Sequence, residues 1–131
     1  MAVRGIRGAT TVDANTREQI ISRTMELLEG LIEKNGISLE DVASAVFSVT
    51  DDVNAEFPAV AARKIGWIYT PLFCTREIPV PGALNLCVRV LLHVNSERKQ
   101  EEMVHLYLHE AEKLRPDLDH SARDRYYRSM K

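Results

Sequence analysis

The sequence predicts an α+β domain in which helices pack on one face of a mixed β-sheet. Three observations lead to this fold class: an amphipathic helical pattern over residues 17–34, an alternating apolar strand over residues 84–94, and several shorter strand-like runs. The chain has 131 residues, which fits one domain with a sizeable core.

The N-terminal segment predicts a strand followed by a long helix. Residues 2–12 become rich in β-branched side chains toward their end, which favours a strand. Thr16 and Gln19 have the spacing of a capping box, and apolar side chains then recur at helical intervals over 17–34. Asn35-Gly36 is typical of a helix end.

The middle of the chain predicts a second strand and a second helix. A helical turn at 38–41 leads into a strand over 43–50, whose one side is expected to carry Ala43, Ala45, Phe47 and Val49. Pro58 suits the first turn of a helix that continues through residue 65 and ends at Gly66.

The remaining segments predict mostly strands. We expect strands over 67–74, 84–94 and 103–108, with an irregular loop at 79–82 and a helical turn within 97–103. The domain is expected to span 1–118, and the polar tail at 119–131 is expected to be mobile.

Composition restricts the class of protein. Hydrophobic residues make up 45% and charged residues 27% of the chain, and the net charge of −2 argues against a general nucleic-acid binder. No apolar run approaches the roughly 20 residues that span a bilayer, and no signal peptide begins the chain, so we expect a cytoplasmic protein without membrane contact. Cys74 and Cys87 are expected to be reduced.

Arg89 is the most unusual residue, because it lies inside the apolar run 84–94, where an uncompensated charge is costly. One interpretation is an ion-paired arginine on a half-solvated sheet face. The other is a cation held to meet a bound anion or a developing negative charge.

Other candidates also have both a structural and a functional interpretation. Arg7, Arg63 and Arg115 are each compatible with a solvated surface position, Glu77 with a local pair to Arg76, and Tyr107 with packing. Taken together, several arginines with one glutamate and one tyrosine, but no nucleophile–base pair, suit a small polycarboxylate. His105 and His109 have a spacing that suits zinc only on a helix, so no metal site is expected.

Six stretches of the chain resemble the AroH-class monofunctional chorismate mutases in collinear order over about residues 1–118. They are VRGIRGATTV (3–12), FPAVAAR (57–63), CTREIPVPG (74–82), CVRVL (87–91), HLYLHEA (105–111) and LRPDL (114–118). The resemblance implies a Claisen-type rearrangement of chorismate to prephenate, toward phenylalanine and tyrosine, without cofactor, metal or covalent intermediate. It also implies a homotrimer of the pseudo-barrel kind with active sites between subunits.

The resemblance also assigns roles to residues. Arg7 would hold a substrate carboxylate together with Tyr107, Arg89 would reach the ether oxygen, and Glu77 with the Cys74 segment would bind the ring hydroxyl. Arg89, Glu77 and Arg7 are the expected catalytic residues. The neighbouring subunit would supply Phe57, Ala59 and Arg63, and Leu114 and Arg115 would lie where the C-terminal segment closes over the site.

Three positions depart from the family pattern. Val60 and Val104 stand where basic residues often occur, and Phe73, an expected wall of the site, stands where a small polar residue is frequent. Two alternative functions stay open from the sequence: an enamine/imine deaminase of the RidA kind, and a trimeric carboxylate sensor without turnover.

Overall fold

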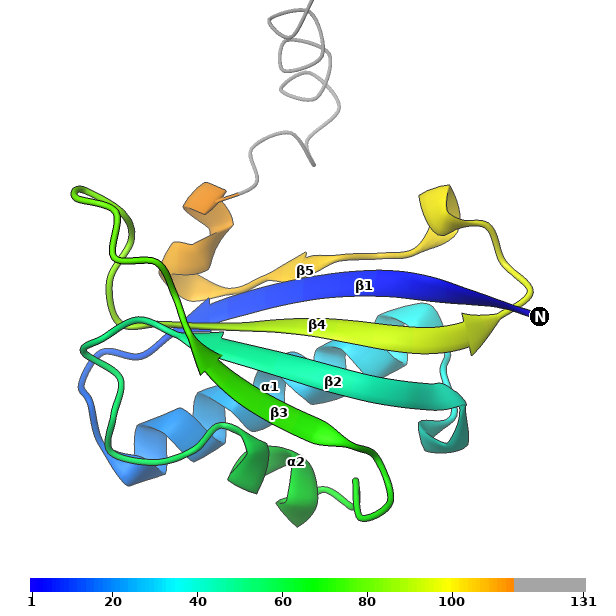
Figure 1. The fold of residues 1–131 in the computed structure, drawn as a ribbon, viewed down its shortest axis with the longest axis horizontal. Helices are drawn as coiled ribbons and strands as arrows, with labels where there is room; N and C mark the ends of the chain where they lie inside the picture. The colour runs from blue at the N-terminus through cyan, green and yellow to red at the C-terminus, as the bar shows by residue number, and fades with distance from the viewer. Residues whose placement is uncertain (115–131) are drawn as a thin grey trace, which may run out of the picture.

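A five-stranded mixed sheet forms the framework of residues 1–114, the part of the chain that the computed structural model describes. The strands are β1 (Ala2–Thr11), β2 (Val42–Val49), β3 (Leu72–Arg76), β4 (Cys87–Ser96) and β5 (Leu106–Tyr107), in the order β3-β2-β4-β1-β5 (Figure 1). The central strand β4 pairs antiparallel with β1 and β2, whereas the edge strands β3 and β5 run parallel to their neighbours. The predicted mixed sheet is therefore confirmed.

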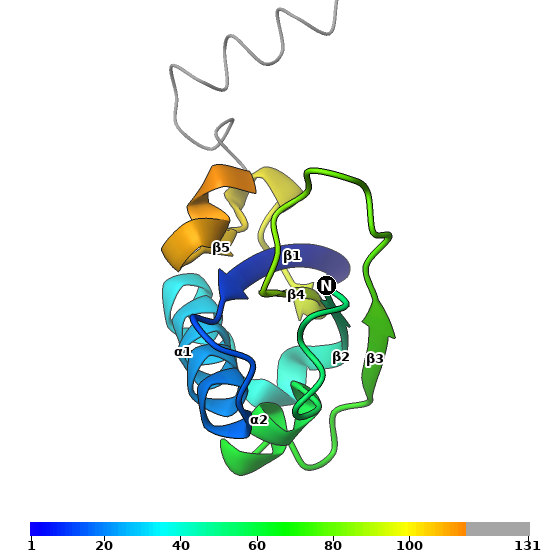
Figure 2. The same ribbon diagram turned by 90° about the vertical axis from the view of Figure 1, so that its left-hand side faces the viewer.

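Two helices, α1 (Arg17–Asn35) and α2 (Ala59–Lys64), cover the same side of the sheet (Figure 2). Short 3-10 helices form at Leu39–Asp41, Gln100–Glu102 and His109–Leu114. The core lies between the helices and the sheet, where leucines of α1 meet apolar side chains of β1, β2 and β4 and the ring of Trp67. Neither helix of the described chain is long and apolar enough to cross a membrane.

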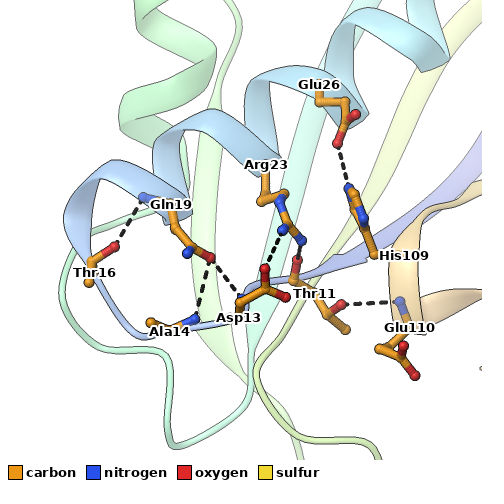
Figure 3. Close-up of polar contacts among 9 residues, drawn as sticks. All are labelled: Thr11, Asp13, Ala14, Thr16, Gln19, Arg23, Glu26, His109 and Glu110. Carbon is orange, nitrogen blue, oxygen red and sulfur yellow. Dashed lines mark hydrogen bonds and ion pairs between the residues drawn. The ribbon is translucent and has the colours of Figure 1, made fainter.

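The predicted first helix is confirmed together with both of its ends. The Gln19 backbone N–H donates to Thr16 Oγ1 at 3.2 Å, and the Gln19 side chain accepts from the backbone N–H of Asp13 at 2.7 Å (Figure 3). Gly36 ends the helix with φ of 59°, a left-handed conformation that favours glycine.

Four sequence-based boundaries were wrong, each for a local reason. Residues 67–71 do not form a strand, because Trp67 turns into the core after Gly66, whose φ is 97°. The strand expected at 84–94 begins only at Cys87, since Leu86 has φ of 49° and its N–H donates to the Asp52 carboxylate. Between 103 and 108 only two residues pair as a strand.

The fourth error concerns the strand expected at 43–50. Its pairing with β4 shifts between Val42 and Ser44, so Val42 is buried and Ala43 is exposed. An irregularity of this kind reverses the alternation of side chains across a sheet. Ala45 and Phe47 still face the core as predicted.

Gly8 explains why a glycine interrupts the first strand. A β-carbon at this position would lie 2.9 Å from Leu31 Cδ1, 3.0 Å from Leu27 Cδ1 and 3.2 Å from the Leu106 carbonyl oxygen. The missing side chain therefore lets α1 and β5 approach β1. At Gly5 the nearest atoms would be 3.9 Å away, so no such closeness is needed there.

Cys87 is fully buried beside Ala9 and Ala111, at the junction between the sheet and the 3-10 helix His109–Leu114. Burial raises the pKa of its thiol from 9.0 to about 11, although the nearby Arg89 guanidinium acts in the opposite direction. Cys74 and Cys87 are both free thiols.

Gly8→Ala should lower the free energy of unfolding by about 1–3 kcal/mol, because the added methyl group overpacks the contact with two leucines. Gly5→Ala is the matched control in the same strand and should be neutral or stabilising by up to about 1 kcal/mol. Chemical denaturation at one protein concentration measures both. Equal effects of the two variants would contradict the close packing at Gly8.

The Cys87 thiol should make stability fall at alkaline pH. Below pH 9 the thiol is protonated in both states, whereas between about pH 9 and 11 the unfolded chain ionises and the folded chain does not. The free energy of unfolding should therefore drop by about 2–3 kcal/mol over this range through Cys87 alone. The difference between the wild type and Cys87→Ala isolates this contribution, and parallel pH profiles of the two proteins would contradict it.

Candidate active site

The face of the sheet opposite the helices carries two of the candidate arginines. Arg7 in β1 and Arg89 in β4 lie on this face because the residues next to them, Ile6 and Val90, are buried in the core. The antiparallel register places Ala9 opposite Arg89 and Arg7 opposite Leu91. Residues distant in sequence are thereby brought to adjacent strands.

Four predicted site residues, Arg7, Glu77, Arg89 and Tyr107, line one depression on this face, with a volume of about 220 Å³. Its other lining residues are Gly8, Val46, Ser48, Val90 and Leu91. Sites that enclose a small ligand usually have volumes of roughly 300–1,000 Å³. The depression of a single chain is therefore smaller than a typical complete site.

Glu77 and Arg89 face each other without a direct hydrogen bond. Arg89 Nε lies 3.6 Å from Glu77 Oε1, and both side chains are about one third exposed, at 32% and 27%. Arg89 Nε is buried and has no hydrogen-bond partner among the described residues. Ser48 Oγ instead donates a hydrogen bond to Glu77 Oε1.

One interpretation of Glu77 from the sequence was a local ion pair with Arg76, and this interpretation was wrong. Arg76 pairs instead with Asp51, which follows the end of β2. The Glu77 backbone N–H donates to the Val49 carbonyl at 2.8 Å, which continues the pairing of β2 and β3 by one residue and directs Glu77 toward Arg89.

A second depression, of about 510 Å³, contains Phe57 and Cys74 but none of the four residues of the first. Its rim is a loop held by Asn15, whose side-chain oxygen accepts from the backbone N–H groups of Asn54 and Ala55 at 3.0 Å. Glu56 accepts from the Phe57 N–H, and this hydrogen bond is the main cause of a lowered pKa at Glu56. The Phe57 ring is left 67% exposed.

The other predicted residues are not brought to Arg89 within one chain. Ala59 and Arg63 lie on α2, on the helical side of the sheet, and line neither depression. Phe73 is 64% exposed on β3. Leu114 packs near Tyr107 against the Ala9–Cys87–Ala111 cluster. Arg115 and the tail 119–131 lie outside the described residues.

The segment that carries Tyr107 and Leu114 is held against β1 and α1 (Figure 3). Leu108 N–H donates to the Ala9 carbonyl at 2.9 Å, and Glu110 N–H donates to Thr11 Oγ1 at 3.2 Å. His109 Nε2 lies 2.8 Å from Glu26 Oε1, so the segment is tied to the helix as well.

His105 and His109, whose spacing was weighed as a metal site and set aside, each have a different partner. The Arg7 backbone N–H donates to His105 Nδ1 at 3.0 Å, whereas His109 contacts Glu26. Within residues 1–114, no three His, Cys, Asp or Glu side chains gather as metal ligands would.

Sequence reasoning missed Ser48, Val46 and Leu91 as lining residues. These residues could have been found from the alternation of side chains along each strand. Val46 and Ser48 alternate with the core residues Ala45 and Phe47, and Leu91 follows Arg89 by two positions, so all three share the face of Arg89.

Comparison with known proteins identifies the family. Residues 3–118 match the family model described as chorismate mutase type I. The chain is 45% identical over 119 residues to chorismate mutase AroH of Bacillus subtilis, an alignment covering 90% of this chain and 94% of the relative. It is 50% identical over 118 residues to chorismate mutase AroH of Thermus thermophilus, covering 89% and 97%.

A solved structure, chorismate mutase from Clostridium thermocellum, superposes with a TM-score of 0.82 at 47% identity, covering 83% of this chain and 97% of that structure. The sequence match and the fold thus agree. The chain belongs to the chorismate mutase type I family, and it is an isomerase that converts chorismate to prephenate.

Proposed function

We propose that this chorismate mutase works as a homotrimer in which the depression around Arg89 is one half of an active site and a neighbouring subunit supplies the other half. The observation that carries the proposal is the buried Arg89 Nε, which has no hydrogen-bond partner in the described chain and lies among Arg7, Glu77 and Tyr107. A buried donor of this kind favours a ligand acceptor.

In the proposed mechanism, the substrate alone undergoes bond changes. One C–O bond of the enolpyruvyl ether breaks and one C–C bond forms, with no proton transfer and no covalent link to the protein. The protein lowers the barrier by holding the enolpyruvyl arm over the ring, which removes unproductive conformers. Binding substrate and transition state equally would not accelerate this step.

Arg89 is assigned the contact that strengthens in the transition state. Negative charge grows on the ether oxygen as the C–O bond breaks, and a fixed guanidinium donor stabilises that charge without reorganising. The position of Arg89 in the central strand β4 supports this role, since its backbone is restrained by pairing with Ala9 on one side and Ser48 on the other.

The other residues are assigned to substrate binding. Arg7 would form a charge-assisted pair with a carboxylate beside Tyr107, and Glu77 would accept from the ring hydroxyl. Leu114 and Arg115 would cover the site. Phe73 and the Cys74 segment would contribute to its wall, although Cys74 itself lines the second depression in a single chain.

Two features support a second subunit. The depression of about 220 Å³ is smaller than a typical enclosed site, and the open face leaves Val3 59% and Phe73 64% exposed. Phe57, Ala59 and Arg63 would then reach the depression of the adjacent subunit. A cytoplasmic location remains the expectation, in line with the precursor role of prephenate in aromatic amino acid biosynthesis.

Arg89→Ala should lower kcat by about 10²–10³-fold, because one oriented donor to a developing charge is lost. Arg89→Lys should also be severely impaired, since lysine keeps the charge but lacks the planar fork. The loss of chorismate absorbance, without added metal or cofactor, measures both. Arg4→Ala is the control, because Arg4 donates to the Arg98 carbonyl outside the depression. Unchanged turnover in Arg89→Ala would refute the assigned role.

Subunit mixing should restore activity if each site draws on two chains. Arg7→Ala and Arg63→Ala trimers should each be impaired, whereas random co-assembly of the two would give wild-type sites at about one quarter of interfaces. Co-assembly of Arg7→Ala with Arg89→Ala is the control and should restore nothing, because both residues line the same depression. Absence of recovery in the first mixture, or a monomeric mass in solution, would contradict the shared site.

A further inference from the structure

We propose that Ser48 is a positioning residue that holds the Glu77 carboxylate back from Arg89, so that Arg89 Nε stays available to the substrate. The inference rests on the role proposed for Arg89. Ser48 itself is not expected to touch the reacting atoms.

Ser48 lies at the centre of three paired strands. In β2 it is opposite Arg89 of β4 on one side and opposite Thr75 of β3 on the other. Its hydroxyl donates to Glu77 Oε1, and the next carbonyl along β2, that of Val49, accepts from the Glu77 N–H. Consecutive residues of one strand therefore fix both the backbone and the carboxylate of Glu77.

The distance between Glu77 and Arg89 shows what this anchoring prevents. A charge-assisted pair between guanidinium and carboxylate normally closes to about 2.7–2.9 Å. Here the gap is 3.6 Å, and Nε has no hydrogen bond within the described chain. The oxygen that faces Nε is the one that accepts from Ser48. Without this anchor the carboxylate would be free to close on Arg89 and occupy the donor.

Ser44 of β2 provides a comparison, because its hydroxyl contacts the residue directly opposite on β4. Ser44, four residues earlier on the same face of β2, contacts His93, its direct partner on β4, at 2.9 Å. Ser48 also has a direct partner on β4, Arg89, yet its hydroxyl contacts Glu77. Ser44 does not line the depression, which makes it a matched control.

Ser48→Ala should lower kcat about tenfold, the scale of one hydrogen bond to a charged group. Ser48→Thr keeps the hydroxyl and should recover most of the activity. Ser44→Ala should leave kcat unchanged. Thermal unfolding of all three variants identifies any loss that comes from misfolding.

A double-variant cycle tests the route through Glu77. If Ser48 acts by restraining the carboxylate, then in a Glu77→Gln background, which has no anion to close on Arg89, Ser48→Ala should cost less than about twofold further. Equal losses in both backgrounds, full activity of Ser48→Ala, or failure of Ser48→Thr to recover activity would each overturn the proposal. Retained activity in Arg89→Ala would instead refute the assigned role of Arg89, so the two failures are distinguishable.

Discussion

The ten-pair antiparallel ladder between β1 and β4 is the constraint on which the site depends. Because side chains alternate across a sheet, this register decides at once which residues enter the core and which face outward. It sends Ile6, Val90 and Leu92 toward α1 and leaves Arg7 and Arg89 on the open face. A slip by one residue would exchange these sets and place a guanidinium in the core. The same pairing therefore determines both the apolar packing of the core and the polar face for which we propose the catalytic role.

The open face combines charges that are not mutually neutralised. Surface pairs such as Arg76–Asp51 and Arg17–Glu56 satisfy their charges locally, whereas Arg89 and Glu77 stop short of a hydrogen bond. Such an arrangement is less favourable for the free protein than a closed pair would be. Under the role proposed for Arg89, it would favour a dianionic substrate, because the protein donors would not have to exchange one partner for another. The donors would then be preorganised around the ether oxygen.

Much of this could be predicted from the sequence, where the determinants are local. The capping pattern at Thr16 and Gln19 located α1, and the position of Arg89 within an apolar strand marked it as a candidate. What the sequence could not show depends on contacts between distant segments. The left-handed Leu86 delays the start of β4 because Asp52 binds its N–H. Glu77 faces Arg89 because its backbone N–H donates to the Val49 carbonyl, while its carboxylate accepts from Ser48. The need for glycine at position 8 likewise depends on a distant segment, because the leucines of α1 fill the space that a side chain would occupy.

The place of β1 within the sheet also bears on how the protein is made. β1 precedes the other described elements along the chain, yet it lies between β4 and β5, which belong to the last third of the described chain. During synthesis, both hydrogen-bonding edges of β1 therefore stay unpaired until β4 and β5 have left the ribosome, and unpaired strand edges promote aggregation. The helix α1 follows β1 directly and carries its own end signals, so it is the neighbour available early. Its leucines can cover the apolar side of β1 while both edges of the strand are still unpaired. The helix α1 would then protect this apolar surface in the nascent chain, as it buries the same surface in the folded core.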